Sequence, residues 1–595
     1  MLNWRIYRAA FVPFVVCMFV AAFSLTSLPH GIGGPLAPEA FDGQRAAGEL
    51  SLLAARYPDR APASAGDESL ADYVAQSLRG SGRAGNGFSV RLQDVAVRTA
   101  SGERQIRLVI ATRPGSTGEA PLLIVAHRDA LGAPSVAQLS GTAVLLELSR
   151  VFAAREMRRA VILASTSAGS AGSEGAAALP ALLGVQPDAA IVLGDLAGTR
   201  VRRPVVQSFA AGTASAPELL TATVAGALER QAGLSSATPS VVSQLSHLVF
   251  PLVPGEQAPL GAAEIPAVQV QVSGETGPAS DQPVSPERLT AVGRGVLESV
   301  DALDGYGPLA PPSTTGLVLG THLLPAWALE LLVLTLLLPP FVALADGLAR
   351  GRRLGARLGR AVVWILGCAI PFLVCALVAW LIGLARLGGL APPPLPSAAV
   401  SADAATIAVI VVVALAFVLG WLAWYALGAR FGLPRLASGQ AAGLVACSLL
   451  VLAALVAALF DPFTALLAIP AAHLWLVFAD GEMRPRPPAA LAIVLAGLVP
   501  LCLIVLFYAL HLALSPLALI WNAIALVATG TVTVPGVVLW CLAFGAAAGV
   551  ALVALAPPEE RPLRRRRDAP KITTRGPMSY AGPGSLGGTE SALRR

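Results

Sequence analysis

Seven apolar runs in the carboxyl-terminal half constrain the fold of this chain most strongly, because each is long enough to cross a lipid bilayer as a helix. They lie near residues 323–346, 361–385, 404–428, 439–460, 462–479, 489–513 and 535–556. Composition agrees, since 55% of the 595 residues are hydrophobic and only 13% are charged. We therefore predict a seven-span transmembrane domain over residues 316–557 in a multi-pass protein of the cell membrane.

An eighth apolar run, at residues 9–28, follows Arg5 and Arg8 near the amino terminus. Positive charge ahead of an apolar run keeps the amino terminus in the cytoplasm and sends the following residues across the membrane. We expect residues 1–29 to be a transmembrane anchor, with a cleaved signal peptide as the alternative. In either case the region that follows is predicted to be exported.

The loops between the apolar runs alternate in arginine content. Basic loops lie at residues 350–360, 430–435 and 483–488 and at the start of the tail, whereas the loops between them contain little arginine. Because arginine accumulates in cytoplasmic loops, this alternation predicts a cytoplasmic, disordered tail over residues 558–595. It also accounts for the net charge of +6, so we expect a lipid bilayer and no nucleic acid as a partner. Residues 517–529 are too short to span and are expected to lie in the interface or to re-enter.

Residues 30–315 form the region with the composition of a soluble domain. Strands with buried-type sequences alternate there with amphipathic helices, which is typical of an α/β domain with a mostly parallel sheet. The predicted strands are 89–97, 105–112, 122–125, 160–165, 189–193 and 267–272, and the predicted helices are 41–57, 68–78, 142–154, 216–231 and 286–303. Residues 305–316, rich in Pro and Gly, are expected to be a linker. The six cysteines lie in apolar segments elsewhere, so no disulfide framework is expected.

The most informative stretch of this region runs from Leu122 to Phe152. A buried strand leads there to His127 and Asp129, and a helix begins near Ser140. Open α/β sheets place their chemistry at the carboxyl ends of strands, so this loop is a candidate site. The order of these elements resembles the di-zinc aminopeptidases and their relatives among the zinc exopeptidases. The resemblance implies an exopeptidase-like α/β fold for residues 30–315.

The resemblance also implies which positions would hold two zinc ions. Three positions keep the family's residue: His127 as a ligand, Asp129 as its orienting carboxylate and Asp195 as a second ligand. Four positions have lost it: Ala137 replaces the bridging carboxylate, Thr166 the general base, Ser167 the ligand beside that base, and Gln257 the last histidine ligand. One His and one Asp cannot hold a metal pair, so no catalytic residue and no cofactor is expected, with zinc only if the protein is active.

Other roles are predicted for the residues that remain. We expect His127 and Asp129 to persist as a hydrogen-bonded pair, and His127, Arg128, Asp129 and Asp195 to form a binding site. Arg128 is a candidate ion-pair partner for Asp195 in place of a metal. His247, ten residues before Gln257, is a less favoured replacement ligand. Glu330, His473 and His511 are noted because ionisable groups inside a membrane are costly and often functional.

A second resemblance concerns the plan of the whole chain. An amino-terminal span, an exported aminopeptidase-like domain without its zinc ligands, and a bundle of further spans resemble the aminopeptidase-like subunit of the glycosylphosphatidylinositol transamidase. The Arg-rich, Ala-rich usage is typical of a GC-rich bacterial genome, where that pathway is not expected.

Three functions remain open on the sequence. The first is an inactive peptidase-like protein whose exported domain binds a peptide, a protein or a lipid-linked partner. The second is an active zinc aminopeptidase with an altered ligand set. The third is a transporter or lipid-handling protein in which the spans do the main work, and it predicts a polar cavity among them.

Overall fold

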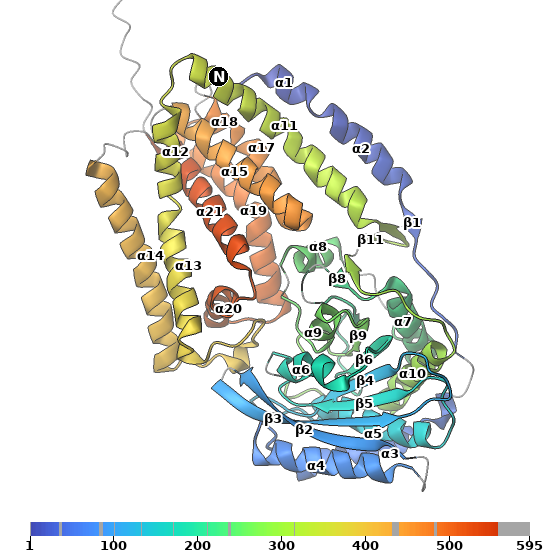
Figure 1. The fold of residues 1–595 in the computed structure, drawn as a ribbon. Helices are drawn as coiled ribbons and strands as arrows, with labels where there is room; N and C mark the ends of the chain where they lie inside the picture. The colour runs from blue at the N-terminus through green and yellow to red at the C-terminus, as the bar shows by residue number, and fades with distance from the viewer. Residues whose placement is uncertain are drawn as a thin grey trace, which may run out of the picture. The chain divides into compact units, whose positions relative to one another are not determined.

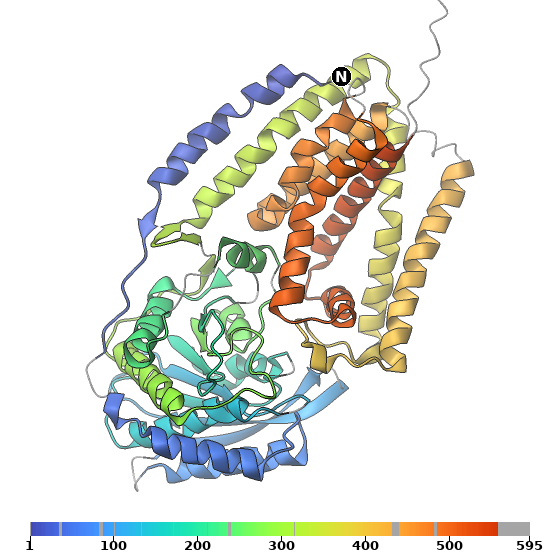
Figure 2. The ribbon, with the colours of Figure 1, turned by 180° about the vertical axis from the view of Figure 1, so that it is seen from behind.

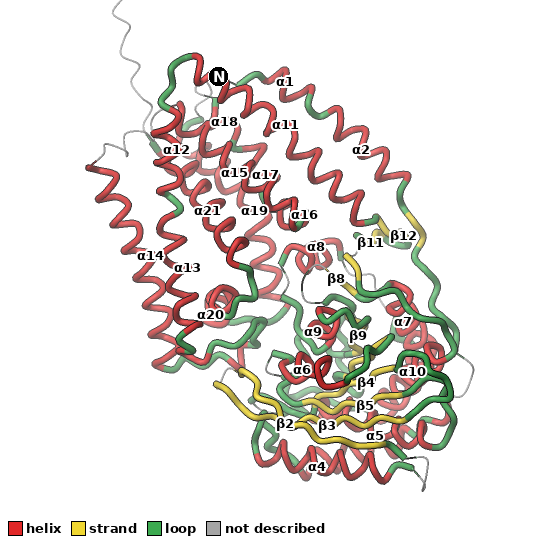
Figure 3. Tube along the Cα trace, in the orientation of Figure 1, coloured by secondary structure: helices red, strands yellow, loops and turns green. Residues whose placement is uncertain are grey.

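The computed structural model describes residues 2–34, 38–82, 87–99, 102–132, 134–170, 172–210, 212, 214–235, 240–250, 252–314, 316–430, 440–480 and 485–556. These residues form an α/β part and a helical part (Figure 1), which Figure 3 distinguishes by secondary structure. The predicted basic tail, residues 558–595, lies outside the described residues, as does most of the basic loop at 430–435.

Seven strands form the central sheet of the α/β part, in the order β2-β3-β5-β4-β6-β9-β7. They are β2 (Ser89–Thr99), β3 (Gly102–Arg113), β4 (Leu122–His127), β5 (Val161–Thr166), β6 (Ala189–Leu193), β7 (Val206–Gln207) and β9 (Ala267–Val270). The four strands β5, β4, β6 and β9 run parallel, as the sequence predicts. Both edges are antiparallel, so the whole sheet is mixed. Two residues separate β2 from β3, a connection that suits an antiparallel pair and is too short for a parallel crossover.

Helices cover both faces of this sheet because side chains alternate along its strands. In β4, Leu122, Ile124 and Ala126 face one apolar cluster, whereas Leu123 and Val125 face the other. The first cluster includes α3 (Gly43–Arg56), α4 (Ala65–Gly80), α5 (Ser140–Ala153), α7 (Glu218–Ala232) and α10 (Pro286–Asp304), and the second includes α6 (Glu174–Leu183) and α9 (Gln257–Ala262). Figure 1 shows α4 and α5 on one side of the sheet and α6 and α9 on the other. The first five helices were predicted; α6 and α9 were not.

Eight helices among the described residues are long and apolar enough to cross a membrane. One of them, residues Val136–Ala153, comprises α5 and the turn before it, and it is buried in the core of the α/β part. The other seven are Trp4–Phe23 (α1, Trp4–Ala9, and α2, Val12–Phe23), α11 (Ala326–Arg353), Leu358–Leu384 (α12, Leu358–Gly367, and α13, Ile370–Leu384), α14 (Ala404–Arg430), α15 (Gln440–Phe460), α19 (Pro487–His511) and α21 (Val534–Leu555).

The run at residues 462–479, predicted as one span, is divided into three short helices: α16 (Pro462–Leu466), α17 (Ile469–Leu474) and α18 (Leu476–Ala479). Pro470 stands in the first turn of α17, where a proline cannot donate the hydrogen bond that would continue the preceding helix. The short apolar run before the last span forms the helix α20 (Pro516–Ala528). Figure 1 views α20 almost end on, so it runs across the long helices.

A small sheet connects the two parts. The strand β1 (Thr26–Ser27) pairs with β12 (His322–Leu324), which pairs with β11 (Leu317–Leu319). The chain therefore leaves α2 and returns to α11 at the same place, and these two helices lie side by side (Figure 2). Part of the predicted linker is the strand β10 (Ser313–Thr314), which pairs with β8 (Ala214–Ser215).

Candidate functional site

A cavity of about 920 Å³ lies where the carboxyl ends of the parallel strands face the helical part. From the α/β part, its polar lining includes His127, Glu174, Glu256, Gln269, Gln271 and Glu275. From the helical part, Pro392–Pro396, Ala398, Leu512, Leu514 and Thr531 line it. The strand-end loop that the sequence singled out therefore does border a ligand-sized space, and segments far apart in the chain close it.

His127 ends β4 and faces a carboxylate that the sequence reasoning missed. Its Nδ1 lies 3.9 Å from Glu256 Oε2, while Glu256 Oε1 accepts a hydrogen bond from the hydroxyl of Thr166, at the general-base position. Burial raises the pKa of Glu256 to about 6, although the neighbouring His127 opposes that rise. Glu256 stands directly before Gln257, so its position beside the lost ligand was the available signal.

Asp129 does not pair with His127 as expected. Its Oδ1 accepts from the backbone N–H of Gly169 at 2.9 Å, and its Oδ2 accepts from the N–H of Ser170 at 3.1 Å and from the Ser170 hydroxyl. The loop after β5 thus folds around this carboxylate. Asp129 acts as an anchor for backbone rather than as a partner of the imidazole.

Arg128 does not reach Asp195, which corrects the expected ion pair. Its fully buried guanidinium has its Nε 2.8 Å from Asp67 Oδ1, on α4. The other oxygen of Asp67 accepts from the hydroxyl of Ser167, which occupies a lost ligand position, at 2.6 Å. Burial raises the pKa of Asp67, and the guanidinium of Arg128 acts against that rise. Arg128 therefore forms a buried ion pair with Asp67, and Ser167 donates a hydrogen bond to the same carboxylate.

Asp195 is also occupied by its own loop. Its Oδ1 accepts from the N–H groups of Ala197 at 3.1 Å and Gly198 at 2.8 Å. It does not line the cavity in the part of the chain that the structure describes. Burial raises the pKa of Asp195, and these hydrogen bonds lower it only in part. The two retained ligands therefore do not share a site: His127 lines the cavity, whereas Asp195 does not.

The residues present do not fit the two zinc ions of the resembled family. Among the described residues, no three His, Cys, Asp or Glu side chains come together as a metal site. Ala137 is buried and apolar at the bridging position, and the Gln257 side chain donates to the carbonyl of Pro254 at 3.2 Å. A structural or catalytic zinc needs at least three protein ligands, and His127 with Glu256 supplies two.

His247 is not a replacement ligand but part of a contact between the two parts. Its Nε2 lies 3.1 Å from Glu275 Oε1, and Nε2 of His511, at the end of α19, lies 3.2 Å from Glu275 Oε2. His247 belongs to α8 (Val241–Val249). The hydroxyl of Tyr508 on α19 lies within hydrogen-bond distance of the carbonyls of Ser246, in α8, and Phe250, directly after it. One carboxylate of the cavity wall is thus held between imidazoles from both parts.

The other ionisable residues noted in the apolar runs also have structural surroundings. His473 uses both ring nitrogens, with Tyr7 at 2.7 Å and the carbonyl of Leu336 at 3.0 Å, and so connects α1, α11 and α17. Glu330 lies on α11, half-buried. These contacts give His473 and His511 a role in packing the helices.

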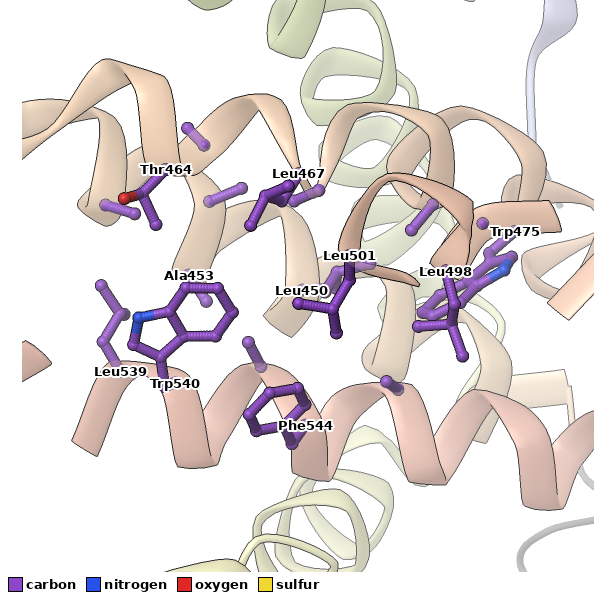
Figure 4. A pocket seen from close by; sticks show the side chains of 18 residues that line it. Leu450, Ala453, Thr464, Leu467, Trp475, Leu498, Leu501, Leu539, Trp540 and Phe544 are labelled. Atoms are coloured by element: carbon purple, nitrogen blue, oxygen red, sulfur yellow. The ribbon is translucent and has the colours of Figure 1, made fainter. Parts of the chain in front are cut away.

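A pocket of about 90 Å³ lies among the apolar helices (Figure 4). Its lining comes from α15, α16, α17, α19 and α21 and is apolar apart from Thr464 and the indole nitrogens, with many alanines that leave space between larger side chains. Figure 4 places Thr464 and Trp540 at the same end of the pocket. This pocket is therefore not the polar cavity that a transporter would need.

A substitution at Gly169 would test how closely this residue packs against His127. A Cβ at this position would lie 2.5 Å from the Cβ of His127 and 3.1 Å from Glu256 Oε1. We expect Gly169→Ala to push His127 away from Glu256 and to lower the free energy of unfolding by about 1–3 kcal/mol. Gly48→Ala is the control, since its Cβ would meet nothing within 4 Å on the exposed face of α3, and it should stabilise by about 0.5–1 kcal/mol. Thermal unfolding of both variants measures the difference, and equal midpoints would contradict the contact.

Comparison with protein families gave a match for part of the chain. Residues 108–242 match the model described as peptidase family M28, which confirms the resemblance to the zinc-dependent exopeptidases for that part of the chain. The α/β part is an M28-like domain, and the chain adds several long apolar helices to it.

Several solved structures are similar to the α/β part. A leucine aminopeptidase precursor from Bacteroides thetaiotaomicron is 15% identical and covers 45% of this chain and 98% of its own, with a TM-score of 0.35. A glutaminyl cyclase from the same organism, bound to N-acetylhistamine, is 16% identical over 45% of this chain and 98% of its own, also at 0.35. LapB from Legionella pneumophila is 15% identical over 48% of this chain and 79% of its own, at 0.38. A search of curated proteins gave no match.

Proposed function

We propose that the chain is a membrane-anchored, peptidase-like protein that binds a ligand in the cavity beside His127 without hydrolysing it. The observation that carries this proposal is that three positions of the family's site are engaged with protein groups: the general-base position, a lost ligand position and a retained ligand position. Thr166 binds Glu256, Ser167 binds Asp67, and Asp195 binds backbone N–H groups. These groups would have to break hydrogen bonds before they could bind a metal or activate water.

The proposal includes the arrangement in the membrane. Residues 1–29 are the amino-terminal anchor, residues 30–315 are extracytoplasmic, residues 316–557 carry the spans and the tail is cytoplasmic. The alternating arginine content of the loops supports this orientation. Protease digestion of intact spheroplasts and of inverted vesicles tests it, because the α/β part should be cleaved from the outer side and a tag on the tail from the inner side.

Metal analysis tests the absence of hydrolysis. We expect the purified full chain to contain less than stoichiometric zinc, to gain no aminopeptidase activity when zinc is added, and to keep the same metal content in a His127→Ala variant. Glu256 beside His127 favours the alternative of an active enzyme, since it supplies a carboxylate from elsewhere in the chain. Stoichiometric zinc that disappears in His127→Ala, together with peptide hydrolysis, would establish that alternative.

A further inference from the structure

The cavity beside His127 has walls from both parts of the structure. One wall belongs to the α/β part. The other includes the strap, by which we mean residues 391–398 in the connection between α13 and α14. Figure 1 shows this connection beside one end of β2 and β3, whereas α8 and β11 lie at the opposite end of the contact between the two parts.

The strap is held firmly by the helical part. Asn522 of α20 accepts a hydrogen bond from the N–H of Leu395 at 2.7 Å and donates one to the carbonyl of the same residue at 3.0 Å. Both residues are buried, and Leu395 packs in an apolar cluster with Trp521 and Ile524 of α20. The hydroxyl of Ser397 binds the turn between α19 and α20. Because buried hydrogen bonds are costly to break, the strap should move together with α20.

The strap rests only loosely on the α/β part. Among the described residues, no hydrogen bond joins residues 391–398 to that part. The strap faces two glycines across a seam: a Cβ at Gly172 would lie 3.4 Å from the carbonyl oxygen of Pro392, and one at Gly132 would lie 3.9 Å from the Cβ of Ala398. These are van der Waals contacts, which can separate without leaving a buried polar group unpaired.

The polar contact nearest to this seam is weak. Arg386, ahead of the strap, lies 2.9 Å from Glu103 at the start of β3, but the two side chains are 67% and 63% exposed. An ion pair so open to water contributes little to holding two surfaces together. The strap side of the contact is therefore the side that can open at low cost.

The opposite side is joined by buried groups. Gln244 of α8 exchanges two hydrogen bonds with Val318 of β11, at 2.9 and 2.7 Å. The hydroxyl of Thr464 in α16 donates to the carbonyl of Val249 at 3.2 Å. Leu248 and Val249 pack in one apolar cluster with residues of α11 and α19. Contacts of this kind favour a fixed side about which the other side can turn.

We propose that the strap is the movable lid of the cavity, and that the cavity opens at the seam while α8 and β11 keep the two parts joined. A ligand in the cavity would touch both walls, so its binding would favour the closed arrangement. This inference goes beyond the proposed function, since it concerns how the cavity is reached rather than what happens to a ligand inside it.

A disulfide across the seam tests the lid. Gly132→Cys combined with Ala398→Cys places two Cβ atoms 3.9 Å apart, within the span of about 3.5–4.5 Å that a disulfide requires. The purified full chain in detergent is treated with diethyl pyrocarbonate, which acylates accessible imidazoles, and modification of His127 is followed by peptide mass spectrometry. If the open arrangement is a minor state that admits the reagent, oxidation of the pair should slow this modification at least about 10-fold, and reduction should restore it.

Three controls isolate the effect of the bridge. The two single-cysteine variants carry the same substitutions, including the strained positive φ at Gly132, and their His127 rates should not depend on oxidation. Ser27→Cys with His322→Cys places cysteines at facing positions of β1 and β12, away from the seam, and its bridge should leave the His127 rate unchanged. His30 is exposed, so its modification reports the strength of the reagent in every sample.

Asn522→Leu tests the strap without any cysteine. It leaves the N–H and the carbonyl of Leu395 without their partners. Because two buried hydrogen bonds are lost, the strap should loosen and His127 should be modified about 5- to 100-fold faster, with no change at His30. An unchanged His127 rate in this variant would contradict the role of the strap as a lid.

The cross-linking results can also overturn the proposal. It fails if the oxidised pair reacts as fast as the reduced pair, or if the control bridge slows His127 equally. It fails as well if the two cysteines do not form a bridge, since they would then not face each other across the seam. Zinc content and peptide hydrolysis, measured on the same samples, report separately on the proposed function.

Discussion

Replacing Arg128 with methionine is expected to lower the free energy of unfolding by about 3–5 kcal/mol, since removing one partner of a buried ion pair leaves the other charge buried and uncompensated. The Arg128 side chain has no exposed surface, and its pair with Asp67 is at 2.8 Å. It also donates to the carbonyl oxygens of Arg107 at 2.6 Å and Ser165 at 3.2 Å, on two adjacent strands. Methionine keeps much of the volume but donates to none of these acceptors.

Arg200→Met is the matched control. Arg200 forms an ion pair of the same length, 2.8 Å, with Asp281, but these side chains are 58% and 69% exposed, so the loss should be below about 1 kcal/mol. Urea unfolding of the full chain, followed by pulse proteolysis, gives both values. Adding Asp67→Asn to Arg128→Met should recover part of the loss, because it removes the unpaired charge. Equal losses of unfolding free energy for the two variants would show that the buried ion pair contributes no more to stability than the exposed one.

Glu275→Gln is expected to cost about 3–5 kcal/mol as well, and to change how stability depends on pH. Burial opposes ionisation of Glu275, but His247 and His511 more than offset it and lower the pKa of this carboxyl to about 2. A pKa below the ordinary value of 4.5 means that the paired carboxylate stabilises the fold above that pH, and that this contribution is lost as the pH falls toward 2. The glutamine variant lacks this carboxylate's contribution to stability already at neutral pH. Its free energy of unfolding should therefore fall less than that of the wild type as the pH is lowered.

Asp281→Asn controls for the change from acid to amide in the same loop, since its side chain is exposed and forms an ion pair with exposed Arg200. We expect it to follow the wild type closely from pH 7 to pH 3. Hydrogen exchange adds a local measurement, because Glu275→Gln should speed exchange in α8 and at the end of α19, where Tyr508 and His511 meet the α/β part. Unchanged exchange in both helices would contradict a role for Glu275 in that contact.

The strands and long helices were predictable because their periodicity is local. Leu122 to Val125 reads as a buried strand whatever surrounds it, and every strand expected in this region is present. The helices α6, α8 and α9 were missed because they are short, and α6 and α9 lie against the second face of the sheet, where burial rather than pattern sets them. Residues 462–479 are divided at Pro470. A count of apolar residues does not register the effect of a proline on a span.

The site was only half predictable, for a different reason. The losses at Ala137, Thr166 and Ser167 could be seen by comparing positions along the chain. What replaced them could not, because Asp67 and Glu256 approach from 100 and 90 residues away along the chain. Arg128 stands beside His127 in sequence yet faces the other side of the loop. Side-chain partners at such separation follow from packing, which one sequence without its fold does not reveal.

The pairing of β1 with β12 has an architectural consequence. Thr26 lies opposite Leu323, so all of residues 28–321 depart from and return to one point beside α2 and α11. The α/β part is therefore an insertion between two neighbouring helices, and a chain that joined those helices by a tight turn would keep the rest of the bundle's connectivity. Gain or loss of the whole lobe in a single genetic event would then require no rerouting of the helices that remain.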